Sequence, residues 1–172
     1  MNGESLQELY SQLEREFHRR GREGIIDSIF HRILKKSFQI VNQKWEKGEK
    51  FGPFLVGKMG EEEWEEVMAI RGMYEYLLEL WANREWEEAR EVGLDMAFLS
   101  ADKRLRQMFS LMVLPILAKV PIEQFLENYL DRSNEPYLGY FFTEFTGKID
   151  PLVQKYGKQF NQRFGKVGKV RE

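Results

Sequence analysis

The sequence contains no cysteine and only two histidines among its 172 residues. A chain without thiols cannot form a disulfide framework, a thiolate zinc site, an iron–sulfur centre or a cysteine nucleophile. His18 and His31 fall on different predicted helices, and the residues three positions before them are Arg15 and Ser28. A di-iron helical bundle would need glutamate at those two positions. We therefore expect no metal site and no cofactor.

Long hydrophobic runs are also missing. The longest apolar stretch, residues 108–120, is interrupted by Pro115 and Lys119, and it is well short of the roughly 20 residues that cross a bilayer. The first residues are acidic and lack the apolar core of a signal peptide. Neither a GxxxxGK[ST] nor a GxGxxG phosphate loop occurs. The sequence predicts a cytoplasmic protein that has no membrane partner and is not an enzyme.

What the sequence does contain is helical periodicity. Apolar residues recur with a period near 3.6 in nearly every segment, and no segment alternates convincingly as a strand would. We expect an all-α fold, a single-domain bundle of about seven to eight helices. Residues 1–150 are the predicted helical domain. Residues 151–172 are a basic, aromatic C-terminal helix and tail that can project from it.

Local signals place several of these helices. Ser5 and Glu8 form a capping box before the first helix, and Asp150 followed by a proline opens the last one. Five carboxylates within residues 61–66 are typical of a helix N-terminus, where the macrodipole favours them, rather than of a catalytic cluster. A helix over residues 84–99 carries a small residue at every fourth position, which predicts the close approach of another backbone: Ala89, Gly93 and Ala97.

Two further helices are expected in the C-terminal half. The proline at position 121 suits the first turn of a short helix through residue 130. A longer helix is expected from Asn134 to Ile149, with its apolar residues forming a buried stripe: Leu138, Phe141, Phe142, Phe145 and Ile149.

The net charge of −2 conceals a segregation along the chain. Residues 1–50 carry +2, residues 51–100 carry −8, residues 101–150 carry −1 and residues 151–172 carry +5. Glutamate supplies 23 of the 28 acidic residues, a balance that favours a thermophile source. The chain therefore has basic ends and an acidic middle, and this polarity is the one sequence feature that points to a partner.

We interpret the basic ends as a surface for nucleic acid. Lys and Arg neutralise phosphates and release counterions, and aromatic side chains can stack on unpaired bases or pack inward. The candidate phosphate contacts of the C-terminal segment are Lys155, Lys158, Arg163, Lys166, Lys169 and Arg171. The candidate aromatic residues are Tyr156, Phe160 and Phe164. A second set of cations lies near the N-terminus: Arg19, Arg20, Lys35 and Lys36.

The leading hypothesis is a non-enzymatic helical protein that assembles with itself and binds nucleic acid, as a packaging protein or a small subunit of a nucleoprotein complex. Two alternatives stay open. The basic ends could dock on the acidic face of another copy, residues 61–91, and form a homo-oligomer. The chain could instead be a helical adaptor or chaperone that binds a partner protein, with a basic tail that only solubilises it.

Overall fold

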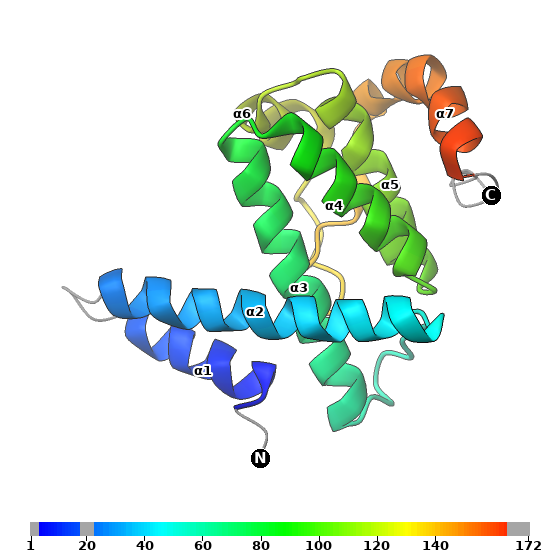
Figure 1. The fold of residues 1–172 in the computed structure, drawn as a ribbon. Coiled ribbons are helices and arrows are strands. Elements are labelled where there is room, and N and C mark those ends of the chain that lie inside the picture. The colour runs from blue at the N-terminus through cyan, green and yellow to red at the C-terminus, as the bar shows by residue number, and fades with distance from the viewer. Residues whose placement is uncertain (1–3, 18–22, 165–172) are drawn as a thin grey trace. The chain divides into compact units, whose positions relative to one another are not determined.

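The structure, a computed structural model, describes residues 4–17 and 23–164, with the side chains of all of them except Glu23 and residues 159–164. The fold class is all-α, as predicted. The described residues form seven α-helices and one sheet of two short strands (Figure 1). The chain divides into two compact units. Unit one comprises residues 1–49 and 54–74, and unit two comprises residues 50–53 and 75–172. The predicted boundary at residue 150 stays a prediction.

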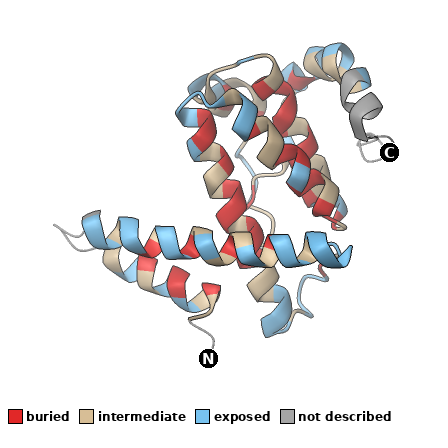
Figure 2. Cartoon of the chain, viewed as in Figure 1, coloured by how far each residue is buried: buried red, intermediate tan, exposed pale blue. Residues whose placement is uncertain are grey.

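Unit one contains α1 (Leu6–Phe17), α2 (Glu23–Lys47) and the part of α3 (Glu61–Ala82) that ends at Tyr74. Figure 2 shows α2 as mostly exposed, with its buried positions confined to a stripe, as the helical period of its apolar residues predicts. The buried residues of this unit come from all three helices and include Leu6, Leu9, Tyr10, Leu13, Ile29, Ile33, Val67 and Ile70.

The predicted capping box at the start of α1 is confirmed. The backbone N–H of Ser5 donates to Glu8 Oε1 at 3.0 Å, and the N–H of Glu8 donates to Ser5 Oγ at 3.1 Å. These two bonds satisfy donors that a helix N-terminus otherwise leaves unpaired. The bond from the Ser5 N–H, followed by the Ser5 hydroxyl, lowers the pKa of Glu8 below its usual value of 4.5.

A close helix crossing within unit one was not expected. An added Cβ at Gly72 of α3 would lie 2.3 Å from Oγ of Ser37 and 3.5 Å from Cγ2 of Ile33, both on α2. Ser37 is fully buried, and its hydroxyl has no hydrogen-bond partner among the described residues. Glycine at position 72 therefore leaves room for this approach, and a residue with a Cβ would fit only if the Ser37 hydroxyl turned away.

Unit two contains α4 (Trp86–Leu99), α5 (Lys103–Leu117), α6 (Ile122–Gln124) and α7 (Asp150–Phe164). α6 runs into a π-helical turn, Phe125–Tyr129, and a 3₁₀ turn, Gly147–Ile149, precedes α7. α4 packs closely against α5 at Gly93. An added Cβ at this position would lie 2.8 Å from Cγ2 of Val113, so glycine leaves the space that α5 occupies. The close approach predicted from the small residues of this helix is thus confirmed at Gly93.

The helix expected from Asn134 to Ile149 is absent, and that prediction was wrong. Leu138 and Gly139 adopt positive φ angles of 56° and 85°, which end any right-handed helix there. Tyr137 and Phe141 instead form an isolated antiparallel bridge. Strand β2 (Glu144–Phe145) then pairs antiparallel with β1 (Leu130–Asp131). β-Branched and aromatic residues are common in this stretch, and they fit strands better than helices.

The core of unit two is apolar and aromatic. Trp81 is fully buried, and its indole N–H donates to the carbonyl of Val120 at 2.8 Å. The centres of the Trp81 and Phe125 rings lie 4.4 Å apart. Phe51 is held against the α4–α5 connection by backbone bonds at both its N–H and its carbonyl, each 2.7 Å long.

Within residues 4–17 and 23–164, every helix lacks the length or the continuous apolar character of a bilayer-spanning segment.

Candidate nucleic-acid interface

α7 presents its described cations on one exposed face. Lys155 and Lys158 are exposed, together with Gln154, whereas Leu152 and Tyr156 are partly buried. Residues three positions apart on a helix are neighbours about 5 to 6 Å apart between Cβ atoms. The two lysines can therefore reach the same stretch of a polyanion, while the apolar side of α7 turns inward.

Tyr156 belongs to the inward side of α7. Nζ of Lys155 lies 5.3 Å from the centre of the Tyr156 ring, within range of a cation–π contact. Of the two roles considered for this tyrosine, packing fits its partial burial better than stacking on a base. The other candidates of the C-terminal segment fall outside the described side chains: Phe160, Arg163, Phe164, Lys166, Lys169 and Arg171.

The second set of cations belongs to unit one. Lys35 is exposed and Lys36 is partly buried on α2, where the charge of Lys36 helps to lower the pKa of Glu8. Arg19 and Arg20 fall outside the described residues. The described lysines of this set belong to unit one, whereas the lysines of α7 belong to unit two.

Ion pairs within unit one offset part of the positive charge of residues 1–50. Arg32 lies 2.6 Å from Glu4, and Lys44 lies 2.7 Å from Glu66. Glu66 belongs to the acidic segment of residues 51–100, so the charge totals of the segments did not show that it pairs with Lys44. Unit one is therefore a weaker candidate for phosphate contact than the linear charge pattern indicated.

Unit two offers a polar groove beside the start of α7. It has a volume of about 720 Å³ and lies between α5, through Arg104 and Gln107, and the segment from Thr143 to Asp150. α7 begins at that last residue, and α5 contacts α7. Lys155 and Lys158 follow one to two turns further along α7. The groove and the exposed lysines therefore belong to one region of unit two.

The side chain of Arg104 is held in place at the edge of this groove. Its Nη2 donates to Oγ1 of Thr143 at 2.8 Å, and its guanidinium carbon lies 4.2 Å from the centre of the Tyr137 ring. The Tyr137 hydroxyl donates in turn to Oδ2 of Asp102 at 2.7 Å. Burial and this bond raise the pKa of Tyr137 well above its usual value of 10.0, so the hydroxyl remains a donor at neutral pH.

Sequence reasoning missed Arg104, although a signal was present. Lys103 and Arg104 fall in the first turn of α5, which contains no acidic residue. Cations are disfavoured near a helix N-terminus because that end of the macrodipole is positive. Asp102, the N-cap whose Oδ1 accepts the N–H of Leu105 at 3.1 Å, supplies the negative charge just before the helix. Basic residues in the first turn of a helix are a local pattern that segment totals of charge conceal.

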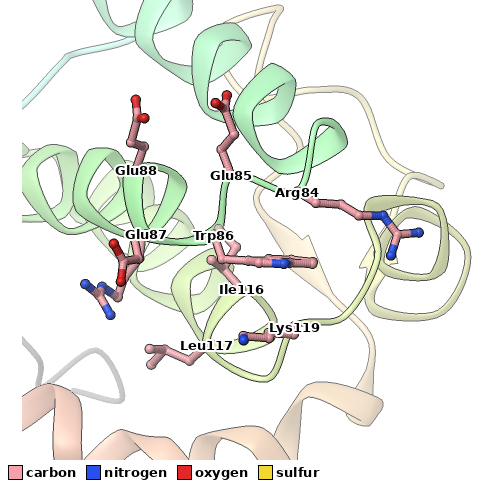
Figure 3. A pocket seen from close by; sticks show the side chains of 9 residues that line it. Arg84, Glu85, Trp86, Glu87, Glu88, Ile116, Leu117 and Lys119 are labelled. Atoms are coloured by element: carbon pink, nitrogen blue, oxygen red, sulfur yellow. The ribbon is translucent and has the colours of Figure 1, made fainter.

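A second hollow of unit two has a volume of about 490 Å³. It lies where α3 gives way to α4, next to the end of α5, and it was not anticipated from the sequence. Figure 3 shows the indole of Trp86 lying across it, flanked by the side chains of Arg84 and Lys119. The carboxylates of Glu85 and Glu88 point away from the ring (Figure 3).

The acidic run at residues 61–66 proves to have two roles. Glu61 starts α3 as predicted, and Glu63 accepts the N–H of Gly60 at 2.9 Å. Glu65 and Glu66 are partly buried and bond to other helices of unit one. Carboxylates that only stabilised a solvated helix start would not make such bonds.

His31 is exposed. No group of three or more metal-ligating side chains occurs within the described part of the chain.

Comparisons with protein-family models, with curated proteins and with solved structures give no match for this chain. The structural class of this protein is therefore described from its fold alone. It is an all-α helical protein with a small two-stranded sheet, and the two hollows described above lie in unit two.

Proposed function

We propose that this protein is a non-enzymatic helical assembly protein that contacts nucleic-acid phosphates through unit two. The observation that supports it best is the exposed pair Lys155 and Lys158 on one face of α7, at the start of the most basic segment of the sequence. Ammonium groups on an exposed helix face bind phosphates by charge alone and release condensed counterions. Such binding needs no catalytic group.

Arg104 adds a directional contact to this charge. Its guanidinium is already oriented by Thr143 and by the ring of Tyr137, so less side-chain entropy is lost when it binds an oxyanion. Guanidinium groups also bind phosphate through two parallel hydrogen bonds. Glu144 and Asp150 line the same groove and would repel a strand that entered it deeply. We therefore expect the phosphate backbone to follow the rim of the groove, past Arg104 and along α7.

The test is the salt dependence of binding by the full chain. A fluorescent 20-base-pair DNA duplex is titrated with protein at several salt concentrations, and binding is followed by anisotropy. Replacing Lys155→Gln and Lys158→Gln together should lower the log–log salt slope by up to about 0.9 for each phosphate that the protein no longer neutralises. Arg104→Gln should lower the slope by the equivalent of one further phosphate.

Lys58→Gln is the matched control, because Lys58 is an exposed lysine in a loop of unit one. It changes the net charge by the same amount per site, and it should leave the slope within error of the unmodified protein. No measurable binding by the unmodified chain at low salt would end the proposal. Equal slopes for the α7 variants and the control would place the phosphate-binding residues elsewhere.

Exposed apolar side chains in unit one support a second candidate function, the binding of a partner protein. Leu55 and Val56 are 65% and 68% exposed in the loop before α3, and Trp45 of α2 is 54% exposed. Apolar residues this exposed are common at protein–protein interfaces. A pulldown from nuclease-treated lysate separates the two functions. One dominant protein that is retained after nuclease, and lost with Leu55→Ser and Val56→Ser, would favour a partner.

A further inference from the structure

The pocket around Trp86 is bordered by two helix ends of the same geometry. At the end of α3, the N–H of Arg84 bonds to the carbonyl of Trp81 and the N–H of Glu85 bonds to the carbonyl of Leu80, both at 2.9 Å. At the end of α5, Lys119 and Val120 repeat this pattern, at 3.0 and 2.9 Å. Both are Schellman motifs, which place one residue in the left-handed conformation.

Glycine is the usual residue at that left-handed position, and this chain uses it elsewhere. α2 ends in the same motif with Gly48 at a φ of 68°. The ends of α3 and α5 carry Arg84 and Lys119 instead, at φ angles of 61° and 56°. A left-handed conformation is strained for residues that have a Cβ. Of these three helix ends, the two that line the Trp86 pocket carry a cation where glycine would be less strained.

The helix dipole alone gives an incomplete account of these cations. The negative C-terminal ends of α3 and α5 favour positive charge, but a lysine or arginine one or two residues earlier would gain the same attraction without the strained backbone. Positions 84 and 119 do place both side chains in the lining of the Trp86 pocket. Figure 3 shows Lys119 running alongside the indole, and Arg84 starting next to the ring with its guanidinium at the outer side of the pocket.

Three of the side chains that line the pocket, those of Trp86, Arg84 and Lys119, match one ligand chemistry, although the lining also includes Glu85, Glu87 and Glu88. The Trp86 indole offers a broad π face, and Arg84 and Lys119 supply positive charge beside it (Figure 3). Its volume, about 490 Å³, lies within the range of small-ligand sites. Arg90 also lines the pocket, but it is paired with Glu91 at 3.2 Å. An aromatic group that carries an adjacent anion satisfies all three principal side chains.

We infer that this pocket binds an unpaired nucleobase of a single strand, stacked on Trp86, with its flanking phosphates on Arg84 and Lys119. The inference rests on the proposed function, which it extends from phosphate contact to a preference for single strands. Stacking on an aromatic side chain tolerates any base, because every base has a π face. A base held in a duplex cannot reach the indole. The protein should therefore favour single strands over duplexes of the same length.

The probe is a 15-nucleotide oligo(dT) with one central 2-aminopurine, whose fluorescence falls when the base stacks on an indole. The full chain is titrated with this strand and with the corresponding duplex. Trp86→Leu should weaken single-strand binding by about 5- to 100-fold and abolish the fluorescence change, and it should leave duplex binding within twofold.

Arg84→Gly and Lys119→Gly separate a binding role from a structural one. Glycine relieves the left-handed strain, so the melting temperature should stay the same or rise by up to about 3 °C. Each variant should nevertheless lower the salt slope of single-strand binding by about 0.7. Arg132→Gln, at an exposed site that does not line the pocket, is the charge control and should leave the 2-aminopurine signal unchanged.

The outcomes distinguish this inference from the proposed function. If the protein binds both probes but the Trp86, Arg84 and Lys119 variants bind the single strand like the control, the pocket inference is wrong and the proposed function stands. If these variants lose single-strand binding while those at Lys155 and Lys158 keep duplex binding, the pocket inference is supported and the assignment of phosphate contacts to α7 is wrong. Binding of neither probe at low salt overturns both.

Discussion

Both units bury apolar side chains, and charged contacts additionally join the helices of unit one. In unit one, Glu65 of α3 accepts the backbone N–H groups of Leu6 and Gln7 at 2.6 and 3.3 Å, and the Arg71 guanidinium lies 3.8 Å from the centre of the Tyr10 ring. Unit two instead encloses fully buried aromatic side chains, including Trp81, Phe109, Phe125 and Phe141. Charged contacts are screened by salt and depend on pH, whereas apolar burial responds little to either. We expect unit one to respond to salt and pH, and unit two to respond to changes in side-chain volume.

The largest effect is expected from adding volume to unit two. Gly93→Ala places a Cβ 2.8 Å from Cγ2 of Val113, and a β-branched side chain in a helix has little rotamer freedom to move away. Overpacking costs about 1 to 3 kcal/mol, and the higher helix propensity of alanine offsets up to about 1 kcal/mol. Urea unfolding should show a net loss of about 1 to 2 kcal/mol.

Two further variants test whether this loss comes from the predicted contact. Adding Val113→Ala to Gly93→Ala removes the clashing methyl group. The double variant should therefore lose less free energy of unfolding than the two single variants lose in sum, by more than about 0.5 kcal/mol. Gly72→Ala in unit one should be less harmful, because its closest contact is the Ser37 hydroxyl, which can rotate. A greater loss for Gly72→Ala than for Gly93→Ala would contradict the contrast between the units.

An intermediate effect is expected from Glu65→Gln in unit one. The carboxylate makes charge-assisted bonds to the start of α1, and an amide oxygen can accept the same hydrogens only in neutral, weaker bonds. We expect a loss of about 1 kcal/mol that shrinks as salt increases. Hydrogen exchange of the Leu6 and Gln7 amides should accelerate.

Glu62→Gln is the control for this change, because Glu62 is exposed in the same first turns of α3. It alters the charge near the helix end equally but should leave exchange at α1 unchanged. Equal acceleration in both variants would mean that net charge, rather than the contact with α1, stabilises that helix.

The smallest effect is a pH dependence carried by Glu8. Its pKa in the folded protein lies below the usual value of 4.5, because the Ser5 N–H and hydroxyl stabilise the ionised form. A lowered folded-state pKa means that ionised Glu8 stabilises the fold above pH 4.5 and that this contribution is lost as the pH falls through the lowered value. The melting temperatures of the unmodified protein and Glu8→Gln should differ slightly at pH 7 and converge at low pH. A difference that grew toward low pH would reverse the sign and refute the assignment.

Much of the fold could be predicted because helix signals are local. The capping box at Ser5, the acidic start of α3 at Glu61 and the start of α7 at Asp150 all follow from residues within a few positions of one another. The prediction failed over residues 134–149, where apolar spacing resembled a helix. The pairing of β2 with β1 and the turn at Gly139 decided the conformation instead.

The candidate sites were only partly accessible to sequence reasoning. The exposed lysines of α7 lie in the segment whose charge total drew attention to it. Arg104 and Trp86 lie in segments with neutral or acidic totals, where summing charge conceals them. Their contacts come from the fold: Arg104 meets Thr143, which is 39 positions away, and Trp86 shares its hollow with Lys119.

The spacing of apolar residues, the composition and the charge pattern were enough to predict a helical protein without thiol chemistry and with a basic C-terminal segment, because these are properties of neighbouring residues. The folded structure was needed to show that Glu65 caps a helix whose first residue lies 59 positions away, and that two cations in strained turns line the same pocket as one indole. The physical reason is the same in both cases. These contacts join segments that are distant along the chain, and no local pattern records which segments folding will bring together.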